Sequence, residues 1–375
     1  MNIGYEAKRI FHNKTGLGNY SRDIIRILSN HYSNNSYFLY NPKKSDQLLF
    51  EANNNNVFEK LPSTKFTKKF KNYWRQKGIV NDLKKDNIVL FHGLSGELPV
   101  GLKKNNIKSI VTIHDLIFMR YPNLYSFFDR KIHYLKFKKA AEAADKIIAI
   151  SQQTKEDIIT YLNVDPCKVT VIYQGCHSVF KENYSELEKD EVLKRYTLPA
   201  NFILNVGTIE ERKNALTIVK SIKDIDTTLV LIGKETSYSK KIRDYIEDNN
   251  LGNKVLFLKG LTNKELAITY QLATLFIYPS IFEGFGIPII EALYSKTPVI
   301  TTKFGVFPEA GGPNSLYIDP NDSNELKEKI ELLLENQSLR TEMIEKGFTF
   351  VQKFNDDVIA LSMNEIYSKT LNLNL

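Results

Sequence analysis

The sequence lacks the cysteines, the long apolar runs and the metal-ligand spacings that mark several classes of protein. Cys167 and Cys176 are the two cysteines among its 375 residues, which excludes a disulfide framework. They have neither the spacing nor the partner histidines of a zinc site, so we interpret them as reduced thiols of a cytoplasmic protein. No apolar run reaches the length that crosses a bilayer, and the N-terminus has no signal-peptide core. We therefore expect a protein that is soluble or lies peripherally on the cytoplasmic face of a membrane.

Length and patterning predict an α/β protein. Short apolar runs, typical of strands buried on both faces, alternate with helical patterns, which predicts parallel sheets joined by right-handed crossovers. The expected strands form two series, 87–91, 108–113, 145–150 and 168–173, then 202–207, 227–233, 254–258, 275–278 and 298–301. The expected helices are 18–31, 126–144, 154–162, 213–223, 237–249, 263–273 and 286–295.

The chain is also too long for one ordinary hydrophobic core, so two domains are expected. A charge-rich stretch at 183–200 separates the two series of strands. We place a Rossmann-like, doubly wound domain at 1–185 and a second at 198–355. In such a pair of domains, a ligand cleft is expected between the two.

The stretch IFEGFGIPIIEALYSKTPVIT, residues 281–301, holds two glutamates on either side of a glycine turn. In parallel α/β sheets, ligands bind beyond the carboxyl ends of strands, and this stretch follows such an end. Gly284 and Gly286 let the backbone approach a ligand, and the helix that follows offers free N–H groups to a phosphate. Glu283 and Glu291 then fit hydroxyls at both ends of a sugar nucleotide. The helix dipole explains Glu291 alone, but not Glu283 and the glycines together.

Three further places in the sequence suit a ligand, two after predicted strands and one at the start of a helix. Arg212 and Lys213 stand after the strand at 202–207, where two adjacent cations neutralise a diphosphate. His114 follows another strand and is the best candidate in the first domain for a polar group facing the cleft. Gly16 and Gly18 form a turn that opens a helix and suits an anion, although the rest of a dinucleotide fingerprint is missing.

Part of the net charge of +8 is concentrated in residues 63–85, which carry eight lysines and arginines against one acidic residue. Phe66, Phe70 and Tyr73 recur at helical spacing with Trp74 beside them, so a helix gathers these aromatics on one side. Such a helix docks on anionic lipid headgroups, or it packs its aromatics on its own core. Both interpretations stay open. No recognised motif accompanies the charge, so we expect no nucleic-acid partner.

With these residues and motifs, the chain resembles a known family, the retaining glycosyltransferases of the GT-B group called family 4, or group 1. The resemblance covers essentially the whole length. It rests on the Gly16–Gly18 turn and on the motifs TIHD at 112–115, AISQQTKEDI at 149–158, VGTIEERKN at 206–214, YPSIFEGFGIPIIEALYSKTPVIT at 278–301, FPEAGG at 307–312 and YIDPND at 317–322. A pair of glutamates separated by seven residues is specific to the family in this context.

The resemblance implies roles for the residues around the glycine turn. Glu283 binds hydroxyls of the donor sugar, beside the backbone amides of Gly284, Phe285 and Gly286. Glu291 holds the ribose hydroxyls.

The same resemblance implies a diphosphate site. Arg212 and Lys213 grip the diphosphate, Gly16 approaches it from the other domain, and His114 contacts the donor sugar near the reacting carbon. Many relatives have an arginine where this chain has Thr208, so the phosphate charge falls on the two cations.

The resemblance implies transfer with retention of configuration to a glycan or polyprenyl-diphosphate-linked acceptor, in synthesis of a surface polysaccharide such as O-antigen or capsule. The subgroup with HD and T-x-E-x-R-K-N motifs favours mannose from GDP-mannose as donor. No divalent metal is expected, because protein cations stabilise the leaving group. Asp224 and Asp226 form an Asp-x-Asp pattern at the wrong end of a strand, which we interpret as a helix-to-strand turn. A helix at 356–371 is expected to cross back onto the first domain.

Two other functions stay open. The same fold hosts sugar-nucleotide epimerases, and a non-catalytic sugar-nucleotide binding protein is a further alternative.

Overall fold

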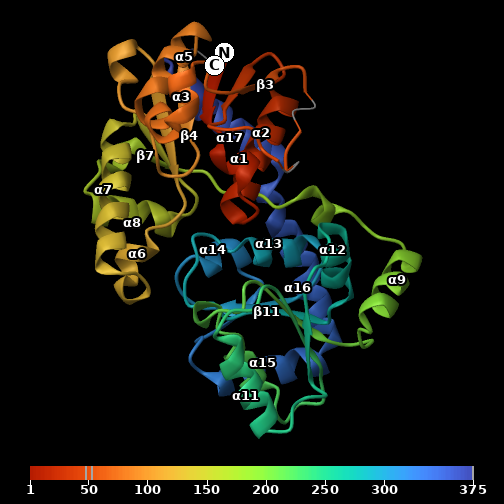
Figure 1. Ribbon diagram of the computed structural model, residues 1–375. Coiled ribbons are helices and arrows are strands. Elements are labelled where there is room, and N and C mark those ends of the chain that lie inside the picture. Colours follow the sequence, from red (N-terminus) through yellow and green to blue (C-terminus); the bar gives the residue numbers. More distant parts are fainter. Residues whose placement is uncertain (47–48, 52–53, 374–375) are drawn as a thin grey trace. The chain divides into compact units, whose positions relative to one another are not determined.

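The computed structural model describes residues 1–46, 49–51 and 54–373. The chain divides into two compact units, which are described separately (Figure 1). Unit 1 comprises Met1–Gly175 together with Phe354–Leu375, and unit 2 comprises Cys176–Lys353.

Unit 1 is built on a seven-stranded parallel sheet in the order β3-β2-β1-β4-β5-β6-β7. Chain order reverses between β1 and β4, which pair side by side, with Ile3 opposite Leu90. Such a reversal opens a crevice at the carboxyl ends of the strands, where α/β proteins bind ligands. The strands are β1 Asn2–Glu6, β2 Ser36–Tyr40, β3 Val57–Lys60, β4 Leu90–Gly93, β5 Lys108–Ile113, β6 Lys146–Ala149 and β7 Val169–Val171.

Helices cover both faces of this sheet. The C-terminal helix α17 packs against α2, and Arg26 on α2 pairs with Asp356 at 2.7 Å between Nη1 and Oδ2. The Ser151 side chain accepts a hydrogen bond from the Thr154 amide and starts α8. The helices are α1 Lys8–His12, α2 Gly16–His31, α5 Ile79–Lys85, α6 Ile117–Arg120, α7 Phe127–Ala143, α8 Gln152–Leu162 and α17 Asp356–Thr370, with short turns η2 Lys103–Asn105, η3 Pro122–Leu124 and η4 Pro166–Lys168. The turn η7 Gln352–Phe354 begins in unit 2 and ends at the first residue of the C-terminal segment of unit 1.

The basic aromatic stretch is not the single helix that its spacing predicts. It forms α3 Lys65–Lys69, α4 Lys71–Tyr73, the π-helical turn η1 Trp74–Gly78 and then α5. Phe66, Phe70 and Tyr73 are 56%, 47% and 48% exposed, and the Phe66 ring contacts the other two, with centroids 4.8 Å from Phe70 in a tilted pair and 5.5 Å from Tyr73 edge-on. Trp74, expected beside them, is instead fully buried and donates its indole N–H to Asp82 at 2.6 Å. The helix breaks because Phe70 leaves the helical region, at φ −104° and ψ 65°.

Unit 2 contains a six-stranded parallel sheet in the order β10-β9-β8-β11-β12-β13. Its chain order reverses between β8 and β11, so the loops after these two strands meet at one edge. The strands are β8 Ile203–Val206, β9 Leu229–Ile232, β10 Val255–Leu258, β11 Leu275–Tyr278, β12 Val299–Thr302 and β13 Leu316–Ile318. The helices are α9 Glu186–Tyr196, α10 Ala215–Ser221, α11 Ser239–Asp248, α12 Asn263–Leu272, α13 Ile287–Tyr294, α14 Phe307–Gly311, α15 Ser323–Glu335 and α16 Gln337–Val351, with turns η5 Ser178–Lys181 and η6 Glu211–Lys213.

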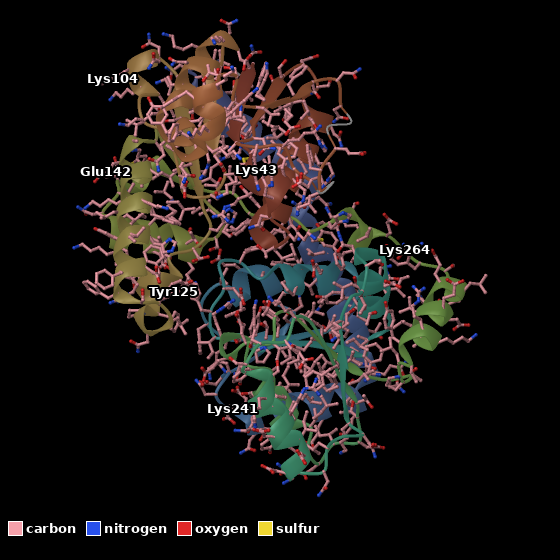
Figure 2. The ribbon with its side chains drawn as sticks, viewed as in Figure 1. Lys43, Lys104, Tyr125, Glu142, Lys241 and Lys264 are labelled. Carbon is pink, nitrogen blue, oxygen red and sulfur yellow. The ribbon has the colours of Figure 1, made fainter. Side chains whose placement is uncertain are left out.

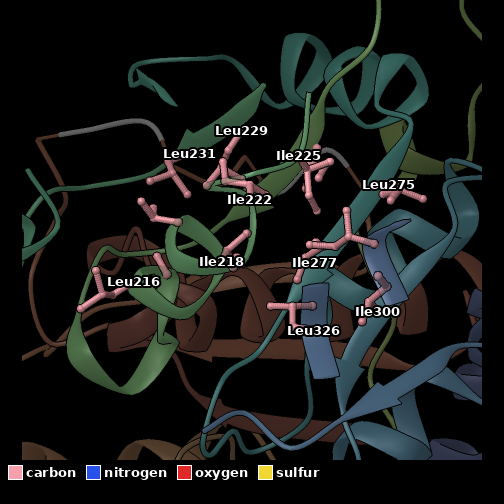
Figure 3. Packing of buried hydrophobic residues seen from close by; sticks show 14 of the residues in the cluster. Leu216, Ile218, Ile222, Ile225, Leu229, Leu231, Leu275, Ile277, Ile300 and Leu326 are labelled. Carbon is pink, nitrogen blue, oxygen red and sulfur yellow. The ribbon is translucent and has the colours of Figure 1, made fainter. Parts of the chain in front are cut away.

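Aliphatic side chains from the sheet and the flanking helices form the core of unit 2 (Figure 3). Leu229 and Ile277 on the strands pack with Ile218 on α10 and Leu326 on α15, and all four are fully buried. Charged side chains on outer helix faces, such as Lys241 on α11, are exposed instead (Figure 2). This rigid interior fixes where β8 and β11 end, and so positions the loops that follow.

The two doubly wound α/β units and all nine expected strands are present, with ends shifted by a few residues. Strands β1, β2, β3 and β13 were not predicted from the sequence. The division between the units falls after Gly175, earlier than the charged stretch 183–200. Residues 176–185, expected in the first domain, belong to unit 2 because η5 packs against α12 and α13.

Candidate functional site

In unit 2, the predicted cations meet one of the predicted glutamates at the carboxyl ends of β8 and β11. Arg212 and Lys213 lie in η6 after β8, and Glu283 lies in the loop after β11. Oε1 of Glu283 is 2.7 Å from Nη1 of Arg212 and 2.5 Å from Nζ of Lys213. All three side chains are largely buried, with 14% to 21% of their surface exposed. The reversal of strand order therefore joins residues that are 70 positions apart in the chain.

Two further side chains in this cluster were missed by the sequence analysis. Tyr278, the last residue of β11, accepts a hydrogen bond from Nζ of Lys213 at 2.5 Å and donates its hydroxyl to Oε1 of Glu283 at 3.0 Å. Ser280 donates its hydroxyl to the same oxygen at 2.8 Å. Their position at and just after a strand end, where ligand-binding residues gather, was the available signal.

The backbones of the two loops are tied together. The amide of Ile281 donates to the carbonyl of Arg212 at 2.9 Å, and the Ser280 hydroxyl, which shares its one proton with Glu283, lies 3.1 Å from the same carbonyl oxygen. In return, the Arg212 guanidinium donates to the carbonyl of Phe282. The side-chain amide of Asn214 reaches Pro279 in the same loop at 3.3 Å. These contacts hold the cations against the loop that carries Glu283.

The positive and negative charges of the cluster are equal in number. Burial by itself raises the pKa of Glu283, but the charges of Lys213 and Arg212 outweigh it and hold that pKa well below its usual range. Burial lowers the pKa of Lys213, against the opposing attraction of Glu283. Arg212 also pairs with Glu210 at 2.7 Å. Two cations thus face two carboxylates, a pairing within the protein that the sequence did not reveal.

The glycine turn leads directly into α13. Gly286 caps this helix with φ 113°, a conformation that side chains disfavour, and no side chain caps the helix. Pro288 lies in the first turn, where its missing N–H leaves no helical hydrogen bond unmade. Phe285 is 2% exposed, so its ring belongs to the core and its backbone is what it offers to a ligand.

Glu291 lies on α13 among apolar residues. Ile289, Ile290, Ala292 and Leu293 are all buried. The hydroxyl of Tyr270 donates to Oε2 of Glu291 at 3.1 Å. Burial raises the pKa of this carboxyl to about 7, with the hydrogen bond from Tyr270 opposing the shift. A buried carboxyl with so little support gains from hydroxyl donors supplied by a ligand.

A pocket of about 630 Å³ adjoins the end of β8 in unit 2. Thr208 lines it, together with residues after the neighbouring strands β9 and β10, among them Gly233, Lys259 and Gly260. The lining is mainly apolar in character, with Ile232, Leu261 and Leu266 contributing side chains.

In unit 1, the two glycines of the N-terminal turn have different surroundings. A Cβ on Gly18 would lie 2.0 Å from the carbonyl oxygen of Asn13, so this position requires glycine. A Cβ on Gly16 would meet nothing within 4 Å. Gly16 is the first residue of α2, whose N-cap Thr15 makes no capping bond through its side chain.

His114 follows β5 and is 8% exposed. Its Nε2 lies 2.9 Å from the carbonyl oxygen of Leu94, and the ring meets Tyr20 edge-on with centroids 4.6 Å apart. Burial lowers the pKa of His114 to about 4, so the imidazole is neutral at pH 7. A carbonyl only accepts, so Nε2 carries the proton and Nδ1 is the acceptor.

The Asp-x-Asp pattern lies where the sequence placed it, in the turn between α10 and β9, and Asp224 pairs there with Lys327 at 3.4 Å. Within residues 1–46, 49–51 and 54–373, no three His, Cys, Asp or Glu side chains gather as they do around a metal ion. Across the same part of the chain, every helix is too short or too polar to span a membrane.

Two family models match the chain, one in each half. Residues 16–178 match the model described as Glycosyltransferase Family 4, and residues 189–350 match the model described as Glycosyl transferases group 1. The matched segments include all the candidate residues of units 1 and 2.

Among curated proteins, the chain is similar to the O-antigen chain mannosyltransferase RfbU of Salmonella typhimurium, with 31% identity over 59% of each chain. It is 30% identical to the capsular polysaccharide biosynthesis glycosyltransferase CapM of Staphylococcus aureus, over 64% of this chain and 65% of CapM. The chain thus matches about three fifths of the length of RfbU.

Solved structures share the whole architecture. The sucrose-phosphate synthase of Thermosynechococcus elongatus superimposes with a TM-score of 0.80 at 21% identity, covering 99% of both chains. HepE of Anabaena, solved in complex with UDP, gives a TM-score of 0.77 at 16% identity over 98% of this chain and 99% of HepE. These likenesses confirm the predicted GT-B fold.

Proposed function

We infer that the chain belongs to the group 1 glycosyltransferases of family 4, whose two models match its two halves, and from that premise we propose that it transfers a hexosyl residue from a nucleotide sugar to a carbohydrate acceptor. The observation that carries the proposal is the cluster of Arg212, Lys213 and Glu283 at the strand reversal of unit 2, beside a glycine turn that opens a helix. Cations and glycines gathered at the start of a helix suit a diphosphate.

We propose that the diphosphate of the nucleotide sugar accepts hydrogen bonds from N–H groups that the contacts within the cluster do not use. The ammonium of Lys213 has three N–H groups, and the contacts described above use two of them, to Tyr278 and Glu283. A phosphate oxygen takes the third. Because the lysine is held before the donor arrives, its charge stabilises the leaving group without reorganisation. Glu283 acts as its counter-ion and, as the family resemblance implies, also binds hydroxyls of the donor sugar.

The nucleoside is assigned to the other end of the site. Glu291 is proposed to accept the ribose hydroxyls, which supply the donors that its buried carboxyl lacks. The pocket beside Thr208 is proposed to hold the base, because its size and apolar lining suit a flat aromatic ring. In unit 1, Gly16 is proposed to approach the diphosphate and His114 the sugar. A neutral imidazole with a free acceptor at Nδ1 suits a sugar hydroxyl.

We propose mannose from GDP-mannose as the donor, transferred with retention to a glycan or polyprenyl-diphosphate-linked acceptor in synthesis of a surface polysaccharide. The support is the similarity to a protein described as an O-antigen chain mannosyltransferase and to one described as a capsular polysaccharide glycosyltransferase. No divalent metal is included in the proposal, because Arg212 and Lys213 supply positive charge where the leaving group forms.

Peripheral contact with an anionic membrane through residues 63–85 is a separate proposal. Phe66, Phe70 and Tyr73 form an exposed aromatic cluster in this segment, with exposed lysines around it. Each basic residue near an anionic surface contributes about 1 kcal/mol. The test variant replaces four of these lysines by glutamine, at Lys65, Lys68, Lys69 and Lys71. It is expected to weaken binding to anionic vesicles, measured by co-sedimentation, by about a hundredfold or more.

The matched control for that experiment replaces four exposed lysines of unit 2 by glutamine, at Lys220, Lys223, Lys240 and Lys241. Equal loss of binding in both variants indicates general electrostatics and overturns the assignment to residues 63–85. Unchanged binding of the first variant overturns it as well.

The proposed activity is tested in two stages. Thermal shifts are measured with GDP-, UDP- and dTDP-sugars, since a ligand at a hundred times its Kd stabilises the folded state by about 2.7 kcal/mol. The donor that stabilises the protein is then incubated with lipid-linked glycan acceptors. Release of nucleotide that requires the acceptor supports transfer. Turnover of the donor without acceptor indicates an epimerase or hydrolase, and binding without any turnover indicates a binding protein; either result contradicts the proposal.

A further inference from the structure

A continuous chain of hydrogen bonds runs through the interior of unit 1, from the C-terminal helix to α2. The hydroxyl of Tyr5 on β1 lies 3.2 Å from that of Tyr367 on α17, which is 2.7 Å from Nδ1 of His92 on β4. Nε2 of His92 is 2.8 Å from Oγ1 of Thr112 on β5, and Oγ1 is 3.3 Å from the hydroxyl of Tyr20 on α2. All five residues are at most 3% exposed.

The imidazole of His92, at the centre of this hydrogen-bond chain, determines which of its two neighbouring hydroxyls donates. Burial lowers the pKa of His92 to about 3, so the ring is neutral, with one N–H donor and one acceptor nitrogen. The hydroxyls of Tyr367 and Thr112 therefore take opposite roles toward the ring, one donating to it and the other accepting from it. A change on one side of the ring is expected to affect the other side, because buried networks of this kind couple their members.

The hydrogen-bond chain ends at Tyr20, which lies beside His114 of the proposed site. The ring of Tyr20 meets the ring of His114 edge-on, at 90° and 4.6 Å between centroids. On its other side, His114 is held by the carbonyl of Leu94. Tyr20 also lies one turn after Gly16, so its hydroxyl fixes the first turn of α2 to β5 through Thr112.

We propose that Tyr20 and His92 are positioning residues for glycosyl transfer, which hold the His114 ring and the first turn of α2 in place through a hydrogen-bond chain anchored on α17. The inference rests on the proposed function. It gives the C-terminal helix a part in the reaction, since Tyr367 is the partner that completes the bonding of His92.

The test uses conservative variants that keep each ring. Tyr20→Phe removes the hydroxyl that bonds Thr112, and Tyr367→Phe removes the partner of His92. Tyr40→Phe is the matched control, because Tyr40 is equally buried in unit 1 and its hydroxyl bonds Asp86 at 2.8 Å, outside the chain. Transfer kinetics, melting temperature and the imidazole NMR signals of His114 are measured for all three.

We expect Tyr20→Phe to lower kcat by about tenfold, which corresponds to about 1.4 kcal/mol in the barrier. The His114 signals shift in the same variant, while the donor affinity changes by less than about threefold. Tyr367→Phe acts in the same direction, and the double variant loses less than the product of the two single effects, because the residues share one network. Tyr40→Phe lowers the melting temperature without changing kcat.

Two results overturn the inference when the wild-type protein is active. One is a Tyr20→Phe protein with wild-type kcat and unchanged His114 signals, and the other is an equal loss of kcat in Tyr40→Phe. An inactive wild-type protein contradicts the proposed function instead. In that case the NMR signals decide the inference alone, because His114 signals that do not respond to Tyr20→Phe or Tyr367→Phe overturn it.

Discussion

The pH dependence of donor binding follows from the buried carboxyl of Glu291. In the free protein, burial raises its pKa to about 7. If ribose hydroxyls donate to the carboxylate, binding selects the ionised form and lowers that pKa. At pH 5 almost every Glu291 is protonated and must release its proton before the donor binds, so the affinity at pH 5 is expected to be about fiftyfold weaker than at pH 7.

The assay is calorimetric titration with the nucleotide sugar that stabilises the protein most, from pH 5 to pH 8. A nucleotide sugar is chosen over a free nucleotide because its diphosphate has no ionisation in this range. Glu283 and His114 do not change charge between pH 5 and 8, since their pKa values are about 2 and about 4. Glu291→Gln is expected to bind more weakly at pH 7 and to lose the pH dependence. A wild-type affinity that is flat across this range, or an equal slope in Glu291→Gln, refutes the ribose assignment.

Three other variants test the remaining parts of the site. Lys213→Ala is expected to reduce kcat by about 10²- to 10³-fold, as for loss of one preorganised charge. Lys220→Ala is the control, because Lys220 is exposed in the same unit. A kcat of Lys213→Ala within twofold of wild type contradicts the leaving-group role. Tyr278→Phe removes a hydroxyl that bonds both Lys213 and Glu283 and is expected to lower kcat by about tenfold; unchanged kinetics show that the ring alone suffices. Gly18→Ala is expected to destabilise the fold by more than about 1 kcal/mol, because the added Cβ meets a carbonyl oxygen. Gly16→Ala is expected to keep the melting temperature and to weaken binding of the nucleotide sugar. Equal melting temperatures of the two variants count against the described turn.

The pattern of strands and helices was predictable wherever strands are buried on both faces. Runs such as KSIVTI at 108–113 and LFIY at 275–278 are rich in aliphatic, β-branched or aromatic residues, and they are strands with the predicted ends. β1, with the sequence NIGYE, was not predicted because it contains a glycine and a charged residue. It is a strand because two neighbours, β2 and β4, pair with it, and a single-sequence pattern does not contain that tertiary information.

The residue types of the site were predictable, but their pairing was not. Strand ends and glycine turns pointed to Arg212, Lys213 and Glu283 individually. That Glu283 neutralises both cations follows from the adjacency of β8 and β11, which the order of elements along the chain does not reveal. The same limit applies to the aromatic stretch, where helical spacing placed Trp74 with the exposed rings although a π-helical turn directs it into the core.

The central claim is that Arg212 and Lys213 bind the diphosphate of a nucleotide sugar. Phosphorus NMR of GDP-mannose titrated with the protein reports on that contact directly, with UDP- and dTDP-sugars as alternatives. The account predicts that the diphosphate signals shift or broaden with the wild-type protein and stay unchanged with an Arg212→Gln, Lys213→Gln double variant that remains folded. Equal perturbation of the signals by both proteins, or none by the wild type with any of these donors, would contradict it.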